Sequence, residues 1–391
     1  MKRIAFVVQR YGIEVNGGAE LHCRQLAEHM AERYDVEILT TKAVDYVTWK
    51  NEYRNDVDTV NGLTVRRFKV AKRRNIDRFN RLSETVLTSP GDPGQELKWM
   101  ELQGPCSPAL VKYIGEHHDD YDLFIFFTYL YYTTFKGMPQ VGRKSVLIPT
   151  AHDEPPIYLS IFRETFNAPA GIFYNTAAEK EFVEGRFGNG HILNNGGYGG
   201  VGVEIPEKIS PESLRKKYGI KEDFIVYVGR IDESKGCLDL FRFFREYKDR
   251  YPSDLKLVLM GRPVLQIPAD PDIISLGFVS DEDKFNGIAA SKLLVLPSPY
   301  ESLSMVVLEA MSLKKPVLVN GNCRVLKDHC LLSNGGLYYY DDVEFCEALQ
   351  YLINNRETAE IMGENGRAYV EAHYDWGSIT DTLSEMIEKL T

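Results

Sequence analysis

The strongest constraint on the fold is an alternation of short apolar strands with amphipathic helices, which runs through both halves of the chain. Strand candidates lie at 4–8, 36–40, 64–68, 123–127, 145–148, 171–174, 224–228, 255–259, 273–276, 293–296 and 317–319. Helical stretches such as 19–34 lie between them. Strands that alternate with helices form parallel sheets covered by helices. The pattern therefore predicts an α/β protein.

Length and glycine content predict two domains. The chain has 391 residues, which is too long for one ordinary core. Residues 194–202 contain five glycines, which suits an interdomain hinge better than a core element. We therefore expect one domain over residues 1–195 and another over 196–375. We also expect an amphipathic C-terminal helix over about residues 376–391.

Composition excludes several classes of protein. The net charge of -10 argues against nucleic acid as the main partner. Six cysteines without a Cys-x-x-Cys pair indicate reduced thiols in a cytoplasmic protein. The first apolar run is too short for a signal peptide, and no run of 18 apolar residues indicates a transmembrane helix.

Two carboxylates mark a strand-to-helix turn in the second half. The stretch 297–316, PSPYESLSMVVLEAMSLKKP, follows an apolar strand and places Glu301 and Glu309 with seven residues between them. Apolar residues then recur at helical spacing until Pro316 stops the helix. Free N–H groups at such a helix start favour an anion, whereas a carboxylate there suits a donor such as a sugar hydroxyl. An N-terminal helix acid and a solvated helix acid explain the spacing equally well.

Two cations flank another strand-to-helix turn. Arg230 and Lys235 lie in GRIDESKG, after the strand at 224–228 and before a helix from about Leu238. An Arg fork and a Lys point charge beside a helix start suit a diphosphate. Solvated loop cations are the alternative.

Two further features lie in the first half. Gly17 and Gly18, in NGGAE, open a helix and permit positive φ and close approach to a ligand. His152 follows the strand at 145–148, at the sheet edge where ligands bind. Alone, the glycines are weak indicators and the histidine is more often structural.

Together these motifs resemble glycosyltransferase family 4, the retaining GT-B enzymes. The resemblance covers nearly the whole chain and is most specific between Val228 and Pro316. It implies two Rossmann-like domains whose parallel sheets face across a cleft, with the C-terminal helix packed on the N-terminal domain. It also implies a hexosyltransferase that uses a nucleotide diphosphate sugar, with UDP-sugar favoured and GDP-sugar next, in polysaccharide or glycoconjugate biosynthesis.

The resemblance assigns a role to each motif. Arg230 and Lys235 hold the donor phosphates opposite Gly17 and Gly18, with His152 near the sugar and the acceptor. Phe278 flanks the base, Glu309 accepts from the ribose hydroxyls, and Glu301 holds sugar hydroxyls. N–H groups near four residues complete the donor site: Leu303, Ser304, Met305 and Val306. The acceptor hydroxyl attacks from the face that the diphosphate leaves, and Glu301, His152, Arg230 and Lys235 are the catalytic set.

One position departs from the family, and no metal site is expected. Ser304 stands where the family very often has Gly, which leaves the donor hexose less certain than the nucleotide diphosphate. Asp120-Tyr121-Asp122 resembles the Asp-x-Asp of metal-dependent transferases, but it begins a buried strand. We therefore expect no metal and no cofactor besides the nucleotide sugar.

A basic segment interrupts the acidic average. Residues 66–81 carry eight basic side chains against one acid, Asp77, with apolar residues between them. Such a segment can dock at the inner membrane face or hold a lipid-linked or phosphorylated acceptor. A solvated loop is the slightly favoured alternative. The acceptor is otherwise expected to be a saccharide.

Two rival functions stay open. A non-hydrolysing nucleotide-sugar epimerase shares the architecture, and Asp153 and Glu154 with His152 could supply its acid–base groups. A non-catalytic nucleotide-sugar-binding protein would have the same donor contacts. The two paired motifs fit a transferase better than an epimerase.

Overall fold

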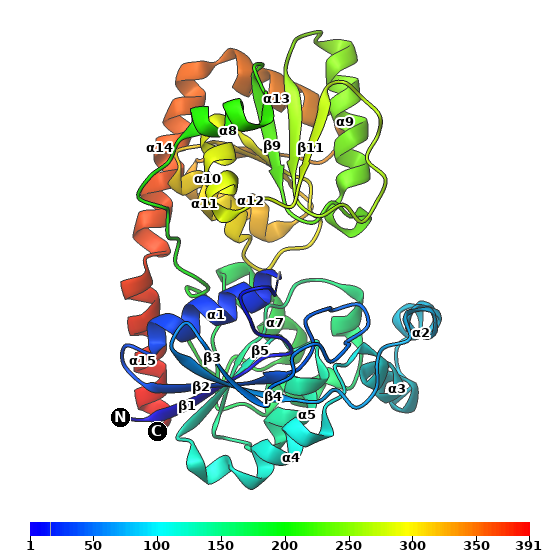
Figure 1. The fold of residues 1–391 in the computed structure, drawn as a ribbon, viewed down its shortest axis with the longest axis vertical. Coiled ribbons are helices and arrows are strands. Elements are labelled where there is room, and N and C mark those ends of the chain that lie inside the picture. Colours follow the sequence, from blue (N-terminus) through cyan, green and yellow to red (C-terminus); the bar gives the residue numbers. More distant parts are fainter. Residues whose placement is uncertain (16) are drawn as a thin grey trace. The chain divides into compact units, whose positions relative to one another are not determined.

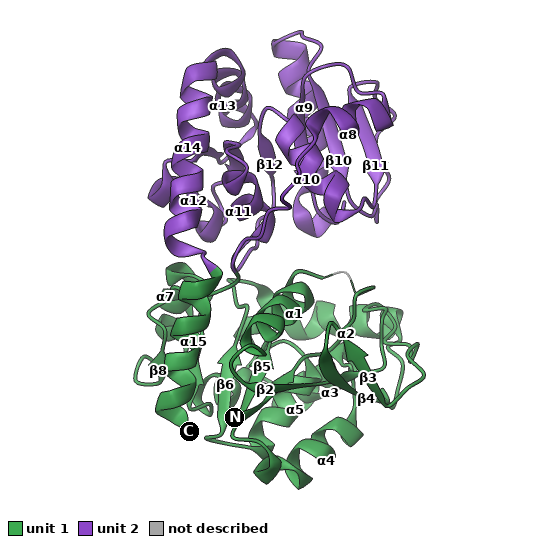
Figure 2. Cartoon of the chain, turned by 60° about the vertical axis from the view of Figure 1, so that its left-hand side comes forward, with its two compact units in different colours: residues 1–201, 376–391 green, residues 202–375 purple. Residues whose placement is uncertain are grey.

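The computed structural model describes residues 1–15 and 17–391, which form two compact units (Figure 1, Figure 2). Unit 1 comprises residues 1–201 and 376–391, and unit 2 comprises residues 202–375. The expected division at 195/196 lies six residues before the observed one, because the glycine segment packs on unit 1. The Asn195 side chain bonds the backbone N–H and carbonyl of Tyr174 at 2.8 Å each. His22 Nε2 lies 2.7 Å from the Gly200 carbonyl oxygen.

Unit 1 is built on an eight-stranded sheet with the strand order β3-β4-β2-β1-β5-β6-β7-β8. Its strands are β1 (Arg3–Val7), β2 (Asp35–Thr41), β3 (Val57–Val60), β4 (Leu63–Phe68), β5 (Leu123–Phe127), β6 (Ser145–Ile148), β7 (Gly171–Ile172) and β8 (Leu193–Asn194). All neighbouring strands are parallel except β3 and β4. That hairpin turns at Asn61 and Gly62, which both have positive φ.

Helices cover both faces of this sheet. On one face α1 (Gly18–Met30) and the C-terminal α15 (Trp376–Leu390) lie side by side (Figure 1). Ile4, Phe6 and Val8 share a buried cluster with Leu26 and Leu383 from these helices. The alternate residues of β1 face a second cluster with the remaining helices: α2 (Ile76–Thr88), α3 (Pro93–Gln103), α4 (Pro108–Glu116), α5 (Tyr132–Gly137), α6 (Phe162–Asn167) and α7 (Ala177–Phe187).

Unit 2 has a six-stranded, all-parallel sheet with the strand order β11-β10-β9-β12-β13-β14. Its strands are β9 (Phe224–Val228), β10 (Lys256–Met260), β11 (Ile273–Gly277), β12 (Leu294–Leu296), β13 (Val317–Asn320) and β14 (Gly336–Tyr339). Its helices are α8 (Pro211–Tyr218), α9 (Cys237–Arg250), α10 (Asp281–Ala290), α11 (Met305–Ser312), α12 (Arg324–Ser333), α13 (Asp342–Asn354) and α14 (Arg356–His373). Right-handed crossovers place α10, α11 and α12 on one face, whereas α9 packs against α13 on the other.

The strand order reverses once in each sheet, and this determines where ligands can bind. In unit 2 the chain runs from β9 to β10 on one side and later continues from β12 on the other. The loops that follow β9 and β12 therefore run from neighbouring strands in opposite directions. A crevice forms between the two loops. In unit 1 the corresponding reversal lies between β1 and β5.

All eleven expected strands are present, with ends shifted by at most two residues. Three further strands, β3, β8 and β14, were not expected; β3 could have been inferred from the Asn-Gly turn that follows it. The first helix is shorter than expected and ends at Met30. Among the described residues no helix combines the length and apolar character needed to cross a membrane.

Candidate functional site

The two loops at the strand reversal of unit 2 touch one another. Gly236 has φ 74° and immediately precedes α9, and a Cβ atom there would lie 2.4 Å from the Pro297 carbonyl oxygen. Only glycine combines this left-handed backbone with so close an approach. The loop after β9 is therefore packed directly on the loop after β12, and the charged residues of both loops share one neighbourhood.

Arg230 is oriented by its own loop. Its Nε lies 3.0 Å from Asp232 Oδ2, and Nη2 lies 3.4 Å from Ser234 Oγ. Asp232 caps the short 3-10 helix Glu233–Lys235 and accepts from the Ser234 N–H at 2.8 Å. Burial opposes ionisation of Asp232, but the hydrogen bonds from Ser234 and the charge of Arg230 lower its pKa below the usual range. The Asp232 carboxylate thus fixes the position of the Arg230 guanidinium within the loop after β9.

Lys235 joins the two loops through an ion pair. Its Nζ lies 2.7 Å from Glu301 Oε1, and the side chains are 33% and 17% exposed. The family resemblance assigns Lys235 to phosphate and Glu301 to sugar hydroxyls. The structure brings these two residues into contact, so each has an oppositely charged protein partner.

The helix α11 begins with an unusual backbone conformation. Ser304 precedes the helix with φ 68°, which is left-handed, and its side chain makes no capping hydrogen bond. A non-glycine residue pays roughly 1–2 kcal/mol in this region. Glycine adopts this conformation without strain, which explains why the family that this chain resembles often has glycine at this position. Met305 and Val306 open the helix, so their N–H groups have no acceptor within it.

Glu309 is buried within α11 and forms an ion pair with a neighbouring helix. It lies in the second turn of α11, is 8% exposed, and its Oε1 is 2.7 Å from Lys284 Nζ on α10. Burial raises the pKa of the Glu309 carboxyl, and Lys284 offsets part of that effect. Burial lowers the pKa of Lys284, but attraction to Glu309 outweighs this and leaves its pKa above the ordinary value. Lys284 could not have been singled out, because its partner lies 25 residues away in sequence.

Phe278 follows β11 and offers an open aromatic face. Its side chain is 67% exposed, and Gly277 before it has φ 69°. An exposed phenyl ring on a ligand-side loop is suited to stacking against a nucleobase. This position is compatible with the role that the resemblance assigns to it.

In unit 1, His152 lies in a polar cluster at the end of β6. Its Nε2 lies 3.3 Å from Glu154 Oε2, and Glu154 Oε1 accepts from the Tyr129 hydroxyl at 2.8 Å. Tyr129 follows β5, so the cluster spans two neighbouring strands. The imidazole is thereby oriented by a carboxylate, which is the arrangement a proton-transferring or hydrogen-bonding histidine needs.

Sequence reasoning missed a buried carboxylate beneath this histidine. Glu179 on α7 accepts the Ala151 N–H at 2.5 Å and the Asn175 N–H at 2.6 Å. It therefore ties together the loops after β6 and β7. Burial raises its pKa to about 8. The Thr176-x-x-Glu179 pattern at the start of α7 could have drawn attention to it.

Gly17 and Gly18, at the start of α1, do not adopt the positive φ that glycine permits. Gly17 is extended with φ -166°, and Gly18 is the first helical residue. Gly17 instead provides space, because a Cβ there would lie 2.1 Å from Glu20 Oε2. Glu20 forms a buried ion pair with Arg10 at 2.6 Å. Asn16 of the same motif lies outside the described residues.

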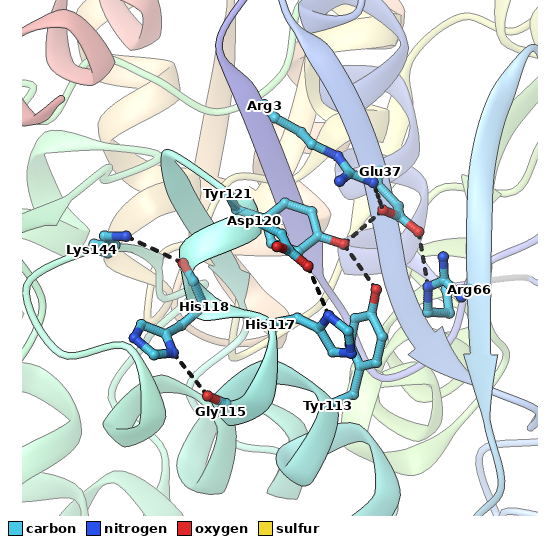
Figure 3. Close-up of polar contacts among 10 residues, drawn as sticks. All are labelled: Arg3, Glu37, Arg66, Tyr113, Gly115, His117, His118, Asp120, Tyr121 and Lys144. Carbon is cyan, nitrogen blue, oxygen red and sulfur yellow. Dashed lines mark hydrogen bonds and ion pairs between the residues drawn. The ribbon is translucent and has the colours of Figure 1, made fainter.

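Asp120 and Asp122 lie at the opposite end of the sheet from His152. Asp120 Oδ2 is 2.7 Å from His117 Nδ1, and Asp122 Oδ2 accepts the Arg3 backbone N–H at 2.7 Å. The Tyr121 hydroxyl between them donates to Glu37 Oε2 at 2.6 Å (Figure 3). These residues precede β5, whereas the His152 cluster follows the strands. The motif is built into a structural hydrogen-bond network.

The basic segment is only partly available to a partner. Arg66 Nε bonds Glu37 at 3.0 Å (Figure 3), and buried Arg67 donates to the Tyr11 carbonyl. Arg74 donates to the Gln103 carbonyl and lies 4.8 Å from the centre of the Trp49 ring. Five of the eight cations are exposed: Lys69, Lys72, Arg73, Arg78 and Arg81. The segment is therefore neither a solvated loop throughout nor a continuous docking surface.

Comparison with known proteins gives a family match in the second half of the chain. Residues 210–369, which contain the loops after β9 and β12, match the family described as "Glycosyl transferases group 1". Alpha-D-kanosaminyltransferase from Streptomyces kanamyceticus is 29% identical over 196 residues, covering 45% of this chain and 48% of that protein. The chain thus matches about half the length of this curated relative.

Solved structures match over the whole chain and identify the fold as that of GT-B glycosyltransferases. Sucrose-phosphate synthase from Thermosynechococcus elongatus gives a TM-score of 0.74 at 16% identity, covering 100% of this chain and 99% of that one. Anabaena HepE in complex with UDP and glucose gives a TM-score of 0.72 at 16% identity, covering 100% of both chains. At this identity the likeness establishes the fold of two Rossmann-like units.

The buried pair Lys284–Glu309 generates the first prediction. Glu309→Ala removes the nearer of the two carboxylates that pair with Lys284 and leaves Asp281 at 3.3 Å, so stability should fall by about 1.5–3 kcal/mol. The double variant Lys284→Met with Glu309→Leu removes both charges and should recover most of that stability. Urea unfolding followed by circular dichroism measures both changes. A Glu309→Ala variant as stable as the wild type would contradict the pairing.

Proposed function

We propose that this chain is a hexosyltransferase that moves a sugar from a nucleotide diphosphate donor to an acceptor hydroxyl. The observation that carries the proposal is the meeting of Arg230, Lys235 and Glu301 beside the N-terminus of α11, at the strand reversal of one parallel sheet. Cations and free helix N–H groups suit a diphosphate, and a carboxylate suits sugar hydroxyls. A ligand that carries both groups fits the set better than either group alone.

The ligand would exchange existing partners for new ones. The diphosphate would compete with Asp232 and Glu301 for Arg230 and Lys235, and the N–H groups of Met305 and Val306 would add hydrogen bonds. Release of Glu301 from Lys235 would free its carboxylate for the sugar. Glu309 would accept from the ribose and Phe278 would stack on the base. The assignment of Gly17, Gly18 and His152 to the same donor stays a prediction.

We further propose that transfer retains the anomeric configuration. The acceptor oxygen bonds the anomeric carbon as the bond from that carbon to the β-phosphate oxygen breaks. The acceptor proton passes to a phosphate oxygen, and the nucleoside diphosphate leaves. Arg230, Lys235 and the helix N–H groups stabilise the charge that develops on the leaving diphosphate. These groups supply the stabilisation that a metal would otherwise give, so no metal is invoked.

The donor is proposed to be a UDP-sugar, with a GDP-sugar as the next choice. HepE was crystallised with UDP and glucose, and the curated relative is named for transfer of a kanosamine unit. The acceptor is proposed to be a saccharide or a lipid-linked saccharide, in polysaccharide or glycoconjugate biosynthesis. The five exposed cations of the basic segment would then face an anionic acceptor or membrane surface.

A donor screen followed by a transfer assay tests the proposal. UDP-, GDP- and ADP-sugars are compared by thermal shift, where a ligand at 100 times its Kd stabilises by about 2.7 kcal/mol. The donor that binds is then offered with saccharide acceptors, with and without excess EDTA. Glycoside formation that survives EDTA, with the donor's anomeric configuration in the product by NMR, is expected. Conversion to an epimeric nucleotide sugar, or binding without turnover, would favour the rival functions.

The two cations of the β9 loop generate a second prediction. Arg230→Ala and Lys235→Ala should each weaken UDP binding about tenfold or more, because a charge-assisted hydrogen bond contributes about 1.5–3 kcal/mol. Uridine binding should change much less, since neither cation is assigned to base or ribose. Calorimetry with both ligands measures the difference. Arg245→Ala, an exposed cation paired with Asp270 in the same unit, is the control. Equal losses for UDP and uridine would exclude the phosphate role.

The exposed part of the basic segment generates a third prediction. Replacing Lys72, Arg73 and Arg78 with Ser should weaken sedimentation with vesicles containing anionic lipid, and the effect should shrink as salt rises. Arg74 is left intact because its contacts stabilise the fold. A control with the same charge change replaces three exposed cations elsewhere, Lys112, Arg356 and Lys389. Equal loss in both variants would show that only net charge matters.

A further inference from the structure

His329 contacts the loop that precedes α11 from the interior of unit 2. It lies on α12, is 2% exposed, and its Nε2 is 2.7 Å from the Leu303 carbonyl oxygen. On its other side, Nδ1 is 3.2 Å from the Tyr369 hydroxyl on α14. The imidazole therefore connects the loop that carries Glu301 to two helices of unit 2.

These contacts and the burial of the ring together determine its protonation. A carbonyl oxygen only accepts, so Nε2 carries the proton and donates to Leu303. Nδ1 then accepts from the Tyr369 hydroxyl. Burial lowers the pKa of His329 to about 4, so the ring is neutral at neutral pH, as this pattern of one donor and one acceptor requires.

The Leu303 carbonyl belongs to the peptide that precedes Ser304. Its hydrogen bond to His329 fixes the plane of that peptide on one side of the Ser304 Cα. On the other side, the Ser304 carbonyl accepts from Val307 N–H at 3.1 Å, which fixes it to α11. Both peptides that flank the Ser304 Cα are therefore held by hydrogen bonds, and the residue between them has φ 68°. A strained conformation of this kind persists only where its surroundings enforce it.

The geometry points to His329 as a positioning residue of the donor site. By holding the left-handed turn at Ser304, it fixes Glu301 relative to the first N–H groups of α11, so that one ligand can contact both. This inference rests on the proposed function, since it assumes that a sugar nucleotide is that ligand. His329 itself touches neither sugar nor phosphate in this proposal.

Two conservative variants separate the bonds that His329 makes. The amide of His329→Gln can place an N–H near the position of Nε2 and keep the bond to Leu303. His329→Asn can retain an acceptor near Nδ1 for Tyr369, but it is too short to reach Leu303. With UDP-glucose as the probe, we expect Kd within about threefold of wild type for the Gln variant and raised about tenfold or more for the Asn variant.

A second substitution distinguishes positioning from general stability. Glycine adopts positive φ without strain, so in Ser304→Gly the turn should no longer depend on the hydrogen bond from His329 to Leu303. His329→Asn combined with Ser304→Gly should then bind UDP-glucose within about threefold of Ser304→Gly alone. Asn334→Gly, which relieves another left-handed residue at the end of α12, should not rescue binding. Rescue by both glycines, or wild-type binding by His329→Asn, would overturn the inference.

Amide hydrogen exchange gives an independent measurement. Peptides covering residues 301–312 should exchange faster in His329→Asn than in His329→Gln, without any ligand. If His329→Asn does not fold, both substitutions are compared in the Ser304→Gly background, where exchange should be equal. If the wild type binds no nucleoside diphosphate sugar, the proposed function fails. The hydrogen-exchange rates of residues 301–312 then test by themselves whether His329 holds the turn at Ser304. Equal exchange in the single variants would overturn it.

Discussion

The ion pair between Lys235 and Glu301 is the interaction on which the candidate site depends. It joins residues 66 positions apart in sequence, one from the loop after β9 and one from the loop after β12. These loops meet because the strand order reverses between β9 and β12, and because Gly236 allows the backbone to approach Pro297. The topology creates the crevice, the glycine closes the distance, and the ion pair holds the cation and the carboxylate within reach of one ligand.

Buried charge is arranged differently at the two ends of the sheets. At the start of the unit 1 strands, Glu37 accepts hydrogen bonds from Arg3, Arg66 and Tyr121, so its carboxylate is fully engaged (Figure 3). At the end of the unit 2 strands, Arg230 and Lys235 keep part of their surface exposed. An ion pair that is open to solvent can exchange its partner for a ligand, whereas a buried and saturated one cannot do so without a large loss of stability. The first arrangement supports the fold and the second can support binding.

The turn before α11 shows how strain and support occur together. Ser304 is held in a left-handed conformation that glycine would adopt freely, and His329 bonds the peptide next to it. The same turn directs the first N–H groups of α11 and carries the chain from Glu301 into the helix. Backbone strain at a ligand-side turn is tolerated where the surrounding packing enforces it. The interior of unit 2 therefore determines the geometry of its surface loop.

Local sequence determined the elements, the motifs and the class of fold. Apolar runs such as Leu123–Phe127 and Phe224–Val228 specify their strands by composition alone, and their alternation with helices requires parallel sheets. It also placed Arg230, Lys235 and Glu301 in loops. Only the tertiary structure decided which distant residues contact one another. Four pairs show this: Lys235 with Glu301, Glu309 with Lys284, Leu303 with His329, and Arg74 with Gln103. These pairs lie 25 or more residues apart, and the short-range patterns of strands and helices carry no information about which distant side chains the folded sheets bring together.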